Sequence, residues 1–259
     1  MNSGNAVLSR LHQATHAAQA IAPLAPEAID RLAGYALQRQ ALERRLAAGE
    51  QLSGWKVAFA GSAAQKRFGL DEPVYGGLTD TMIVEPDTAV AFSRLIQPKL
   101  EIELAFVLGR ALGPGDYRDE DILAAIGEVA PAFEIADCRW QGWDFGVGAF
   151  LADNAAAGLY CLGARIPFDP VQHVSVAYRL ECEGALCCSG DTRDREDSPL
   201  ANLCWLIRRL LADGQRVEAG QVVLSGALLP PMNIQPTTYR LHMFGTQLAL
   251  VFTAGAAPV

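Results

Sequence analysis

Glu101 and Glu103 stand two residues apart in an apolar run, residues 98–108, whose large and branched side chains predict a β-strand. Because side chains alternate along a strand, both glutamates share a face with Ala105 and Val107. Two carboxylates on one apolar face cost free energy unless a positive group neutralises them. A divalent metal ion is the simplest such group, so this spacing predicts a carboxylate metal site.

A second Glu-x-Glu pair, Glu181 and Glu183, provides an internal comparison. Its face of the predicted strand 174–183 also carries Ser175 and Arg179, which is typical of a solvent-exposed face. Burial therefore favours the first pair as the site and the second as surface residues.

Glu134 interrupts another apolar run, residues 130–137, with Ala132 and Ala136 on its own side. A helix with Asp119 as its N-cap, carrying Ile122, Ala125, Ile126 and Val129, is predicted between the two strands. A strand–helix–strand unit can bring its strands side by side, so Glu134 is the third candidate ligand.

Lys56 and Asp80 are two further candidates. Lys56 is a lone cation in the predicted strand 54–59. It is either an edge lysine with its charge in water or a lysine aimed into a pocket, where it could bind a carboxylate or shuttle a proton. Asp80 lies in residues 73–82, which two glycines predict to be a loop, and there it either caps a turn or acts in catalysis.

The three glutamates favour a hard cation such as Mg²⁺ or Mn²⁺ over Zn²⁺, because the set contains no Cys or His. Three ligands on an octahedral ion leave positions for water or for a substrate with adjacent carboxylate and keto or enolate oxygens. The ion would then act as a Lewis acid and stabilise enolate charge. A purely structural cluster of carboxylates is the alternative.

The composition predicts one large domain, or a domain with a helical appendage, since the chain has 259 residues of which 51% are hydrophobic. A net charge of -8 without a basic cluster argues against nucleic acid or an anionic membrane as partner. Six cysteines without a CxxC pair indicate reduced thiols in a cytoplasmic protein. We find no signal peptide and no apolar run long enough for a membrane span.

Apolar periodicity and capping residues predict several helices that precede or surround these strands. They cover residues 4–20, 26–48, 63–70 and 198–213, and the second carries an apolar stripe that includes Leu32 and Leu46. A closing hairpin is predicted around Gly245.

Several separated motifs then carry a resemblance to a known family. They are Gly54-Trp55-Lys56, residues 98–108, residues 131–137, Ala152-Asp153-Asn154-Ala155 with Gly158, Ser198-Pro199-Leu200 and residues 222–228. In this order they resemble the 2-keto-4-pentenoate hydratase and 4-oxalocrotonate decarboxylase branch of the fumarylacetoacetate hydrolase superfamily. The resemblance extends from about Gly49 to Phe252.

The resemblance implies an α+β fold: a mixed, mainly antiparallel β-sandwich roll, like the C-terminal domain of fumarylacetoacetate hydrolase, with N-terminal helices. Residues 1–75 would form an N-terminal helical region with the first strand, and residues 76–259 a metal-binding β-roll catalytic domain. It implies Mg²⁺ or Mn²⁺ held by Glu101, Glu103 and Glu134. The catalytic residues would be Lys56 and Asp80, and the substrate contacts Lys56, Asn154, Ala156 and Gly226. A homo-oligomer, and a complex with a related decarboxylase, would be the partners.

Three departures from the family pattern make the predicted pocket more apolar. The family has serines after Asp-Asn, where this chain has Ala155, Ala156 and Ala157. Phe150-Leu151 replaces an acid-threonine pair, and residues 235–238 replace a Pro-Gly-Asp turn. These changes leave the predicted metal ligands in place.

We therefore predict a divalent-metal-dependent hydratase, a lyase that adds water to a 2-hydroxy-dienoate or 2-oxo-alkenoate through a metal-stabilised enolate. Decarboxylation of a 2-oxo acid and hydrolysis of an acylpyruvate share that enolate and are the alternatives. A non-catalytic homologue that binds a metal or small acid and acts as a scaffold is the second alternative.

Overall fold

Two β-sheets organise the computed structural model, which describes residues 3–254. The first sheet has eight strands in the order β2-β1-β10-β4-β5-β6, with β11 added to β4 and β7 added to β5. Its strands are β1 (Leu52–Ala58), β2 (Val74–Thr79), β4 (Pro98–Leu108), β5 (Ile126–Asp137), β6 (Ala157–Leu162), β7 (Ile166–Pro167), β10 (Val222–Leu224) and β11 (Met232–Asn233).

The second sheet has five strands in the order β3-β13-β12-β8-β9. They are β3 (Ala89–Ala91), β8 (Ala177–Cys182), β9 (Ala185–Asp191), β12 (Thr238–Met243) and β13 (Thr246–Thr253). Only the pairs β1–β10 and β3–β13 are parallel among these described strands. The predicted α+β class, with a mixed and mainly antiparallel roll, is therefore confirmed.

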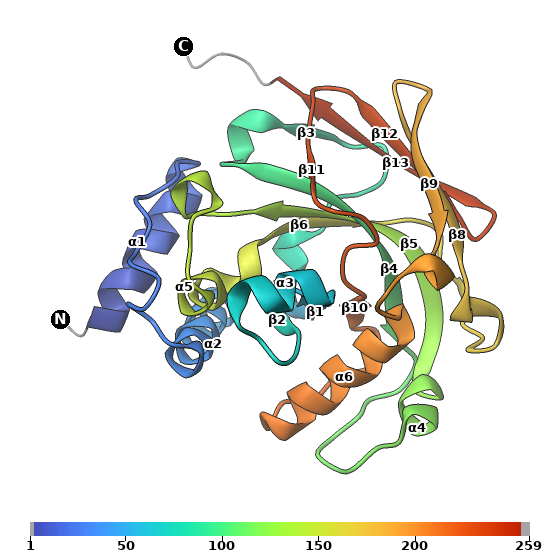
Figure 1. Ribbon diagram of the computed structural model, residues 1–259, viewed down its shortest axis with the longest axis horizontal. Coiled ribbons are helices and arrows are strands. Elements are labelled where there is room, and N and C mark those ends of the chain that lie inside the picture. The colour runs from blue at the N-terminus through green and yellow to red at the C-terminus, as the bar shows by residue number, and fades with distance from the viewer. Residues whose placement is uncertain (1–2, 255–259) are drawn as a thin grey trace.

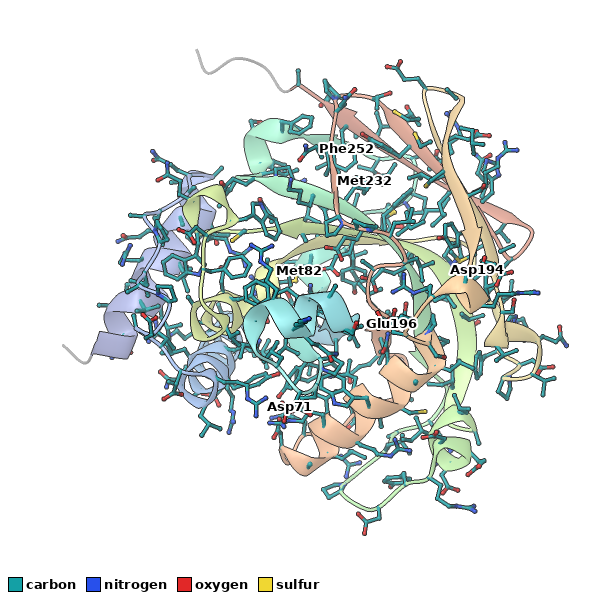
Figure 2. All side chains as sticks on the ribbon, in the orientation of Figure 1. Asp71, Met82, Asp194, Glu196, Met232 and Phe252 are labelled. Atoms are coloured by element: carbon teal, nitrogen blue, oxygen red, sulfur yellow. The ribbon has the colours of Figure 1, made fainter. Side chains whose placement is uncertain are left out.

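The helices lie around the first sheet: α1 (Ser3–Ala17), α2 (Arg31–Ala47), α3 (Ser62–Phe68), α4 (Asp119–Leu123), α5 (Val147–Ala152) and α6 (Pro199–Ala212). Figure 1 shows α1, α2 and α5 together at one side of the molecule, and strands β8, β9, β12 and β13 at the other. Figure 2 shows side chains between these elements, where Met82 and Phe252 are buried while Asp71 and Asp194 are exposed.

The first sheet curls until its two ends meet. Residues that follow β2 reach β6, where the backbone N–H of Val84 donates to Tyr160 O at 2.8 Å and Ile83 forms a bridge with Tyr160. The curl gives β4 an inner face with Ala105 and Val107 and an outer face that joins the main core. Glu101 and Glu103 follow the inner face by alternation.

Two helix predictions need correction. α2 begins at Arg31 rather than near residue 26, because Asp30 accepts the N–H of Ala33 at 2.8 Å and so caps the helix there. Its buried side is Gly34, Tyr35, Leu37 and Gln38, and Leu32 is 78% exposed, so the predicted stripe was wrong. α6 begins as predicted, with Ser198 as cap and Pro199 in its first turn.

The predictions for residues 119–129 and 73–82 were also wrong in part. The N-cap of α4 is Arg118 rather than Asp119, and the helix ends at Leu123. Ile126 and Val129 belong to β5, because their apolar spacing fits either a helix or a strand. Residues 74–79 form the buried strand β2 rather than a loop. Gly76 is needed there for space, since a Cβ would lie 2.5 Å from Asn154 O.

Strand β1 lies in mid-sheet between β2 and β10. The sheet is thus continuous across residue 75, and the division into residues 1–75 and 76–259 stays a prediction. Among residues 3–254, no helix combines the length and the apolar character needed to cross a membrane.

Candidate metal centre

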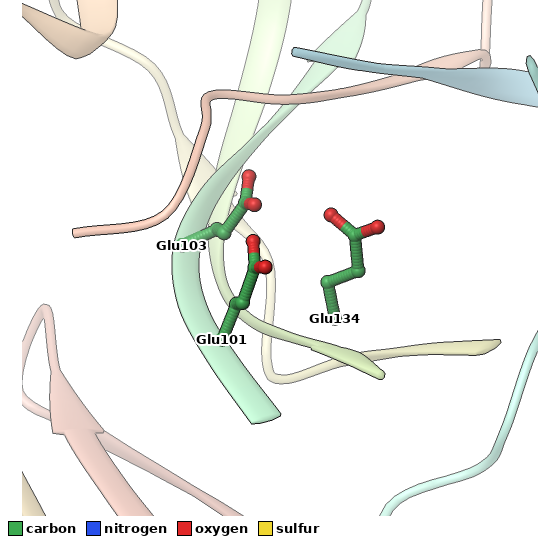
Figure 3. A group of neighbouring side chains, drawn as sticks. All are labelled: Glu101, Glu103 and Glu134. Atoms are coloured by element: carbon green, nitrogen blue, oxygen red, sulfur yellow. The ribbon is translucent and has the colours of Figure 1, made fainter. Parts of the chain in front are cut away.

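Strands β4 and β5 bring the three predicted glutamates together. Glu101 pairs directly with Glu134 in the antiparallel register, and Glu103 pairs with Ala132. One carboxylate oxygen from each glutamate lies within 4.8 Å of the other two. Figure 3 shows all three carboxylates directed toward a shared space. Glu103 and Glu134 are fully buried, and Glu101 is partly buried. The predicted burial of the Glu101–Glu103 pair is therefore confirmed.

The comparison pair lies elsewhere. Glu181 is in β8, where its carboxylate pairs with Arg179 and lies 3.4 Å from Nε2 of His242. Glu183 lies beyond the end of β8 in an exposed turn with φ 53°. The prediction that it shares a strand face with Glu181 was therefore wrong. Neither belongs to the carboxylate cluster.

Lys56 reaches the cluster from two strands away. It pairs with Leu224 of β10, which pairs with Ala105 of β4, so Lys56 has the same facing as Glu101 and Glu103. Its Nζ lies 2.8 Å from Glu134 Oε1, and the side chain is only 2% exposed as a residue. The edge-lysine interpretation is therefore wrong, and the role of Lys56 in binding a substrate carboxylate or moving a proton stays a prediction.

Burial and mutual repulsion disturb the protonation of these groups. Burial, and then the charge of Glu134, raises the pKa of Glu101 to about 7. The same causes, with Glu101 added, raise the pKa of Glu103 well above its ordinary value. Burial alone would lower the pKa of Lys56, but Glu134 and Glu101 outweigh it and the pKa is raised. A bound cation would reduce the repulsion among these carboxylates and favour their ionised forms.

The cluster fits a divalent cation. Glu103 Oε1 and Glu134 Oε2 are buried and have no hydrogen-bond partner within the described chain, whereas Glu103 Oε2 accepts the N–H of Gly226 at 2.7 Å. Buried oxygens of this kind need a donor or a metal. Three ionised carboxylates and one ammonium sum to two negative charges, which a divalent ion balances, and oxygen ligands suit Mg²⁺ or Mn²⁺.

Without metal, the protein should become less stable as the pH rises from about 5 to about 8. The folded pKa of Glu101, about 7, lies above the ordinary value of 4.5. Between these values the folded chain binds more protons than the unfolded chain, so the free energy of unfolding falls as pH rises. Calorimetry in EDTA at constant ionic strength would measure this trend.

The matched variant is Glu101→Gln, which removes one titrating group and should make the trend shallower, while Glu103, whose pKa is also raised, keeps the rest of it. Saturating Mg²⁺ should do likewise, because it favours the ionised carboxylates. A melting temperature with the same pH dependence in wild type and Glu101→Gln would contradict the assignment.

A short turn after α5 covers the inner face beside Lys56. Residues Asn154–Ala156 form one 3₁₀ turn, and the side chain of Asn154 donates to Gly77 O at 2.8 Å and accepts the N–H of Gly77 at 2.9 Å. Gly76, the strand partner of Lys56, faces the carbonyl of Asn154. The amide of Asn154 is thus engaged by β2, and its predicted contact with substrate stays a prediction, as does that of Ala156.

Sequence reasoning missed Arg139, which is 8% exposed and pairs with the buried Asp153. Burial raises the pKa of Asp153 to about 6, even though Arg139 acts in the opposite direction. The available sequence signal was an arginine two residues after Asp137, followed by the aspartate of the Asp153-Asn154 motif.

The structure does not bring Asp80 to Lys56. Asp80 Oδ1 accepts the N–H groups of Gln51 and Thr81, each at 3.0 Å, but the N-cap of the turn Asp80–Met82 is Thr79, so the turn-capping role stays a prediction. Gln51 and Lys56 are five residues apart, or about 16 Å along an extended strand. The catalytic role of Asp80 stays a prediction that this geometry does not support.

Two cavities flank the curled sheet, of about 720 and about 770 Å³. The first lies between α1, α2 and the Asn154 turn, and the second is lined by Tyr160, Val222 and the residues after β2. None of the three glutamates lines either of these two cavities.

Two curated relatives match most of this chain. A 2-keto-4-pentenoate hydratase of Paraburkholderia phymatum is 32% identical over 94% of this chain and 95% of its own length. A 2-hydroxyhexa-2,4-dienoate hydratase of Comamonas testosteroni is 36% identical over 85% of this chain and 86% of its own. No protein-family model matches.

Among solved structures, 4-oxalocrotonate decarboxylase of Pseudomonas putida G7, complexed with magnesium and adipate, superposes with a TM-score of 0.88. It is 23% identical, and the match covers 97% of this chain and 99% of the other. This likeness confirms the fold.

Proposed function

The chain belongs to the 2-keto-4-pentenoate hydratase family, and from this premise we propose that it is a lyase that adds water to a 2-hydroxy-dienoate or 2-oxo-alkenoate. The observation that carries the proposal is the buried cluster of Glu101, Glu103 and Glu134, with Lys56 2.8 Å from Glu134. Oxygen-only ligands, unpaired buried oxygens and a neighbouring ammonium are what a metal-assisted reaction of an acid substrate requires.

Glu101, Glu103 and Glu134 would hold Mg²⁺ or Mn²⁺. When bound, such an ion polarises the oxygens of a 2-oxo acid and stabilises the negative charge that develops on them. The ammonium of Lys56 lies beside Glu134, where it can attract the substrate carboxylate and carry a proton to or from the reacting carbons. The turn Asn154–Ala156, which packs against β2 beside Lys56, would limit the access of water from the covering side.

Decarboxylation and acylpyruvate hydrolysis use the same stabilised charge, so the metal ligands alone do not separate them from hydration. Sequence identity supports hydration, because the relatives at 32–36% identity cited above carry hydratase names. A non-catalytic scaffold would have no need for a fully buried lysine at the cluster. Assembly as a homo-oligomer, or with a related decarboxylase, remains part of the proposal.

The test is an assay of the purified protein with Mg²⁺ against 2-hydroxypenta-2,4-dienoate, 2-hydroxyhexa-2,4-dienoate, 4-oxalocrotonate and an acylpyruvate. We expect loss of the dienoate absorbance and incorporation of one water per molecule. Release of CO₂ from 4-oxalocrotonate at a higher kcat/KM would favour decarboxylation. Mg²⁺ binding without turnover of any compound would favour the scaffold.

A further inference from the structure

The turn at Asn154–Ala156 is strained. Its three residues have φ values of 54°, 52° and 54°, which lie in the left-handed region. This conformation costs roughly 1–2 kcal/mol for each residue with a Cβ, and residues are held in it only where surrounding contacts determine the backbone. Three such residues in succession, two of them alanine, therefore require stabilising contacts from other parts of the chain.

Arg139 supplies contacts at both ends of the turn. Its Nη2 donates to Asp153 O at 2.6 Å, and its Nη1 donates to Ala157 O at 3.0 Å. Its Nε donates to the carboxylate of Asp153, which also accepts the backbone N–H of Arg139 at 2.9 Å. The planar guanidinium thus joins the residue before the strained segment to the residue after it, which a single ammonium could not do.

The held turn is in direct contact with the strand next to Lys56. The side-chain amide of Asn154 makes two hydrogen bonds to the backbone of Gly77, and its carbonyl occupies the space that a side chain at Gly76 would need. Gly76 is the register partner of Lys56. A shift of the turn would therefore open the cover beside the ammonium.

We propose that Arg139, oriented by Asp153, is a positioning residue for the reaction at the metal centre. It fixes the strained turn against β2 so that the turn covers the inner face of the sheet beside Lys56. This inference rests on the proposed function for its kinetic consequence, whereas its structural consequence is independent of any substrate. The glutamates are placed by the β4–β5 ladder, so metal binding does not depend on Arg139.

The competing explanation is that Arg139 and Asp153 form a buried ion pair that only stabilises the fold. A buried pair of this kind can be energetically important without affecting a site. In that case substitution would lower stability, but each folded molecule would keep its wild-type turnover and its wild-type cover.

The experiment compares Arg139→Gln and Arg139→Lys with wild type and with Arg209→Gln. Arg209 is also ion-paired, to Glu72 and Asp213, but does not contact the turn, so it is the matched control. Arg139→Lys keeps a charge opposite Asp153 and so preserves more of the stability, while its ammonium cannot span Asp153 O and Ala157 O.

Four quantities are measured on each folded protein: the amide hydrogen-exchange rates, the Mg²⁺ dissociation constant, kcat and KM. For both Arg139 variants we expect exchange at Gly77 and Ala156 to accelerate about 10-fold or more, exchange along β4 and β5 to stay unchanged, and Mg²⁺ affinity to stay within about threefold. We expect kcat to fall about 10-fold or more.

Wild-type exchange at Gly77 in the two Arg139 variants would overturn the inference, whether or not any substrate is turned over. Faster exchange with unchanged kcat per folded molecule would also overturn it and favour the purely stabilising pair. If wild type turns over none of the compounds, the proposed function fails, and faster exchange at Gly77 with retained Mg²⁺ binding would still support the positioning role.

Discussion

Glu103→Gln should weaken Mg²⁺ binding by about 100-fold or more, because changes to residues that merely support metal ligands already cost 10–100-fold. Glutamine keeps the side-chain volume and an oxygen for the N–H of Gly226, which Glu103 Oε2 accepts at 2.7 Å. The variant therefore removes charge and little else. Isothermal titration calorimetry with Mg²⁺ and with Mn²⁺ would measure the loss.

The same substitution should make the metal-free protein more stable at about pH 8, because it removes one of three crowded carboxylates whose ionisation burial opposes. A structural carboxylate cluster predicts the reverse, since loss of a structural contact destabilises. These opposite signs separate a metal site from a structural cluster.

The matched control is Glu183→Gln, which changes the same residue type in the exposed turn after β8. We expect no change in Mg²⁺ affinity and a change in stability within about 0.5 kcal/mol. Equal loss of metal binding in Glu103→Gln and Glu183→Gln, or no loss in either, would contradict the assignment of the site.

The metal cluster was predictable because it follows from the side-chain pattern within single strands. Alternation along one strand places Glu101 with Glu103, and an apolar run around Glu134 indicates a second buried strand. What alternation does not provide is the register, and the direct pairing of Glu101 with Glu134 depends on how two strands align across a turn.

Features that depend on distant segments were missed or misplaced. Gly76 was interpreted as a loop residue. The structure instead requires a glycine there because a Cβ would collide with the carbonyl oxygen of Asn154, 78 positions further along the chain. Asp80 follows Lys56 in the sequence at a distance compatible with a shared site, but the antiparallel pairing of β1 with β2 takes it to the far end of β1. Arg139 acts on a turn formed only after the chain has passed through α5.

Lys56→Met should reduce kcat by about 100- to 10,000-fold, the usual contribution of a proton-transferring side chain. Methionine has a similar length and no charge, so it fills the buried space that Lys56 occupies between β2 and β10. Mg²⁺ affinity should stay the same or rise, because the ion no longer shares Glu134 with an ammonium 2.8 Å away. Stopped-flow turnover and calorimetry on the same sample would measure both.

The role of Lys56 is identified by comparing how saturating Mg²⁺ affects the stability and the kcat of Lys56→Met. If the lysine were only a structural counter-ion, Lys56→Met would lower stability without metal by about 3–5 kcal/mol, and saturating Mg²⁺ would restore both stability and activity. If it handles protons, Mg²⁺ restores stability and leaves kcat low. Lys66→Met, in the exposed part of α3, is the control and should change neither quantity. Turnover of Lys56→Met within about threefold of wild type in saturating Mg²⁺ would exclude a catalytic lysine, since general acid–base groups contribute far more.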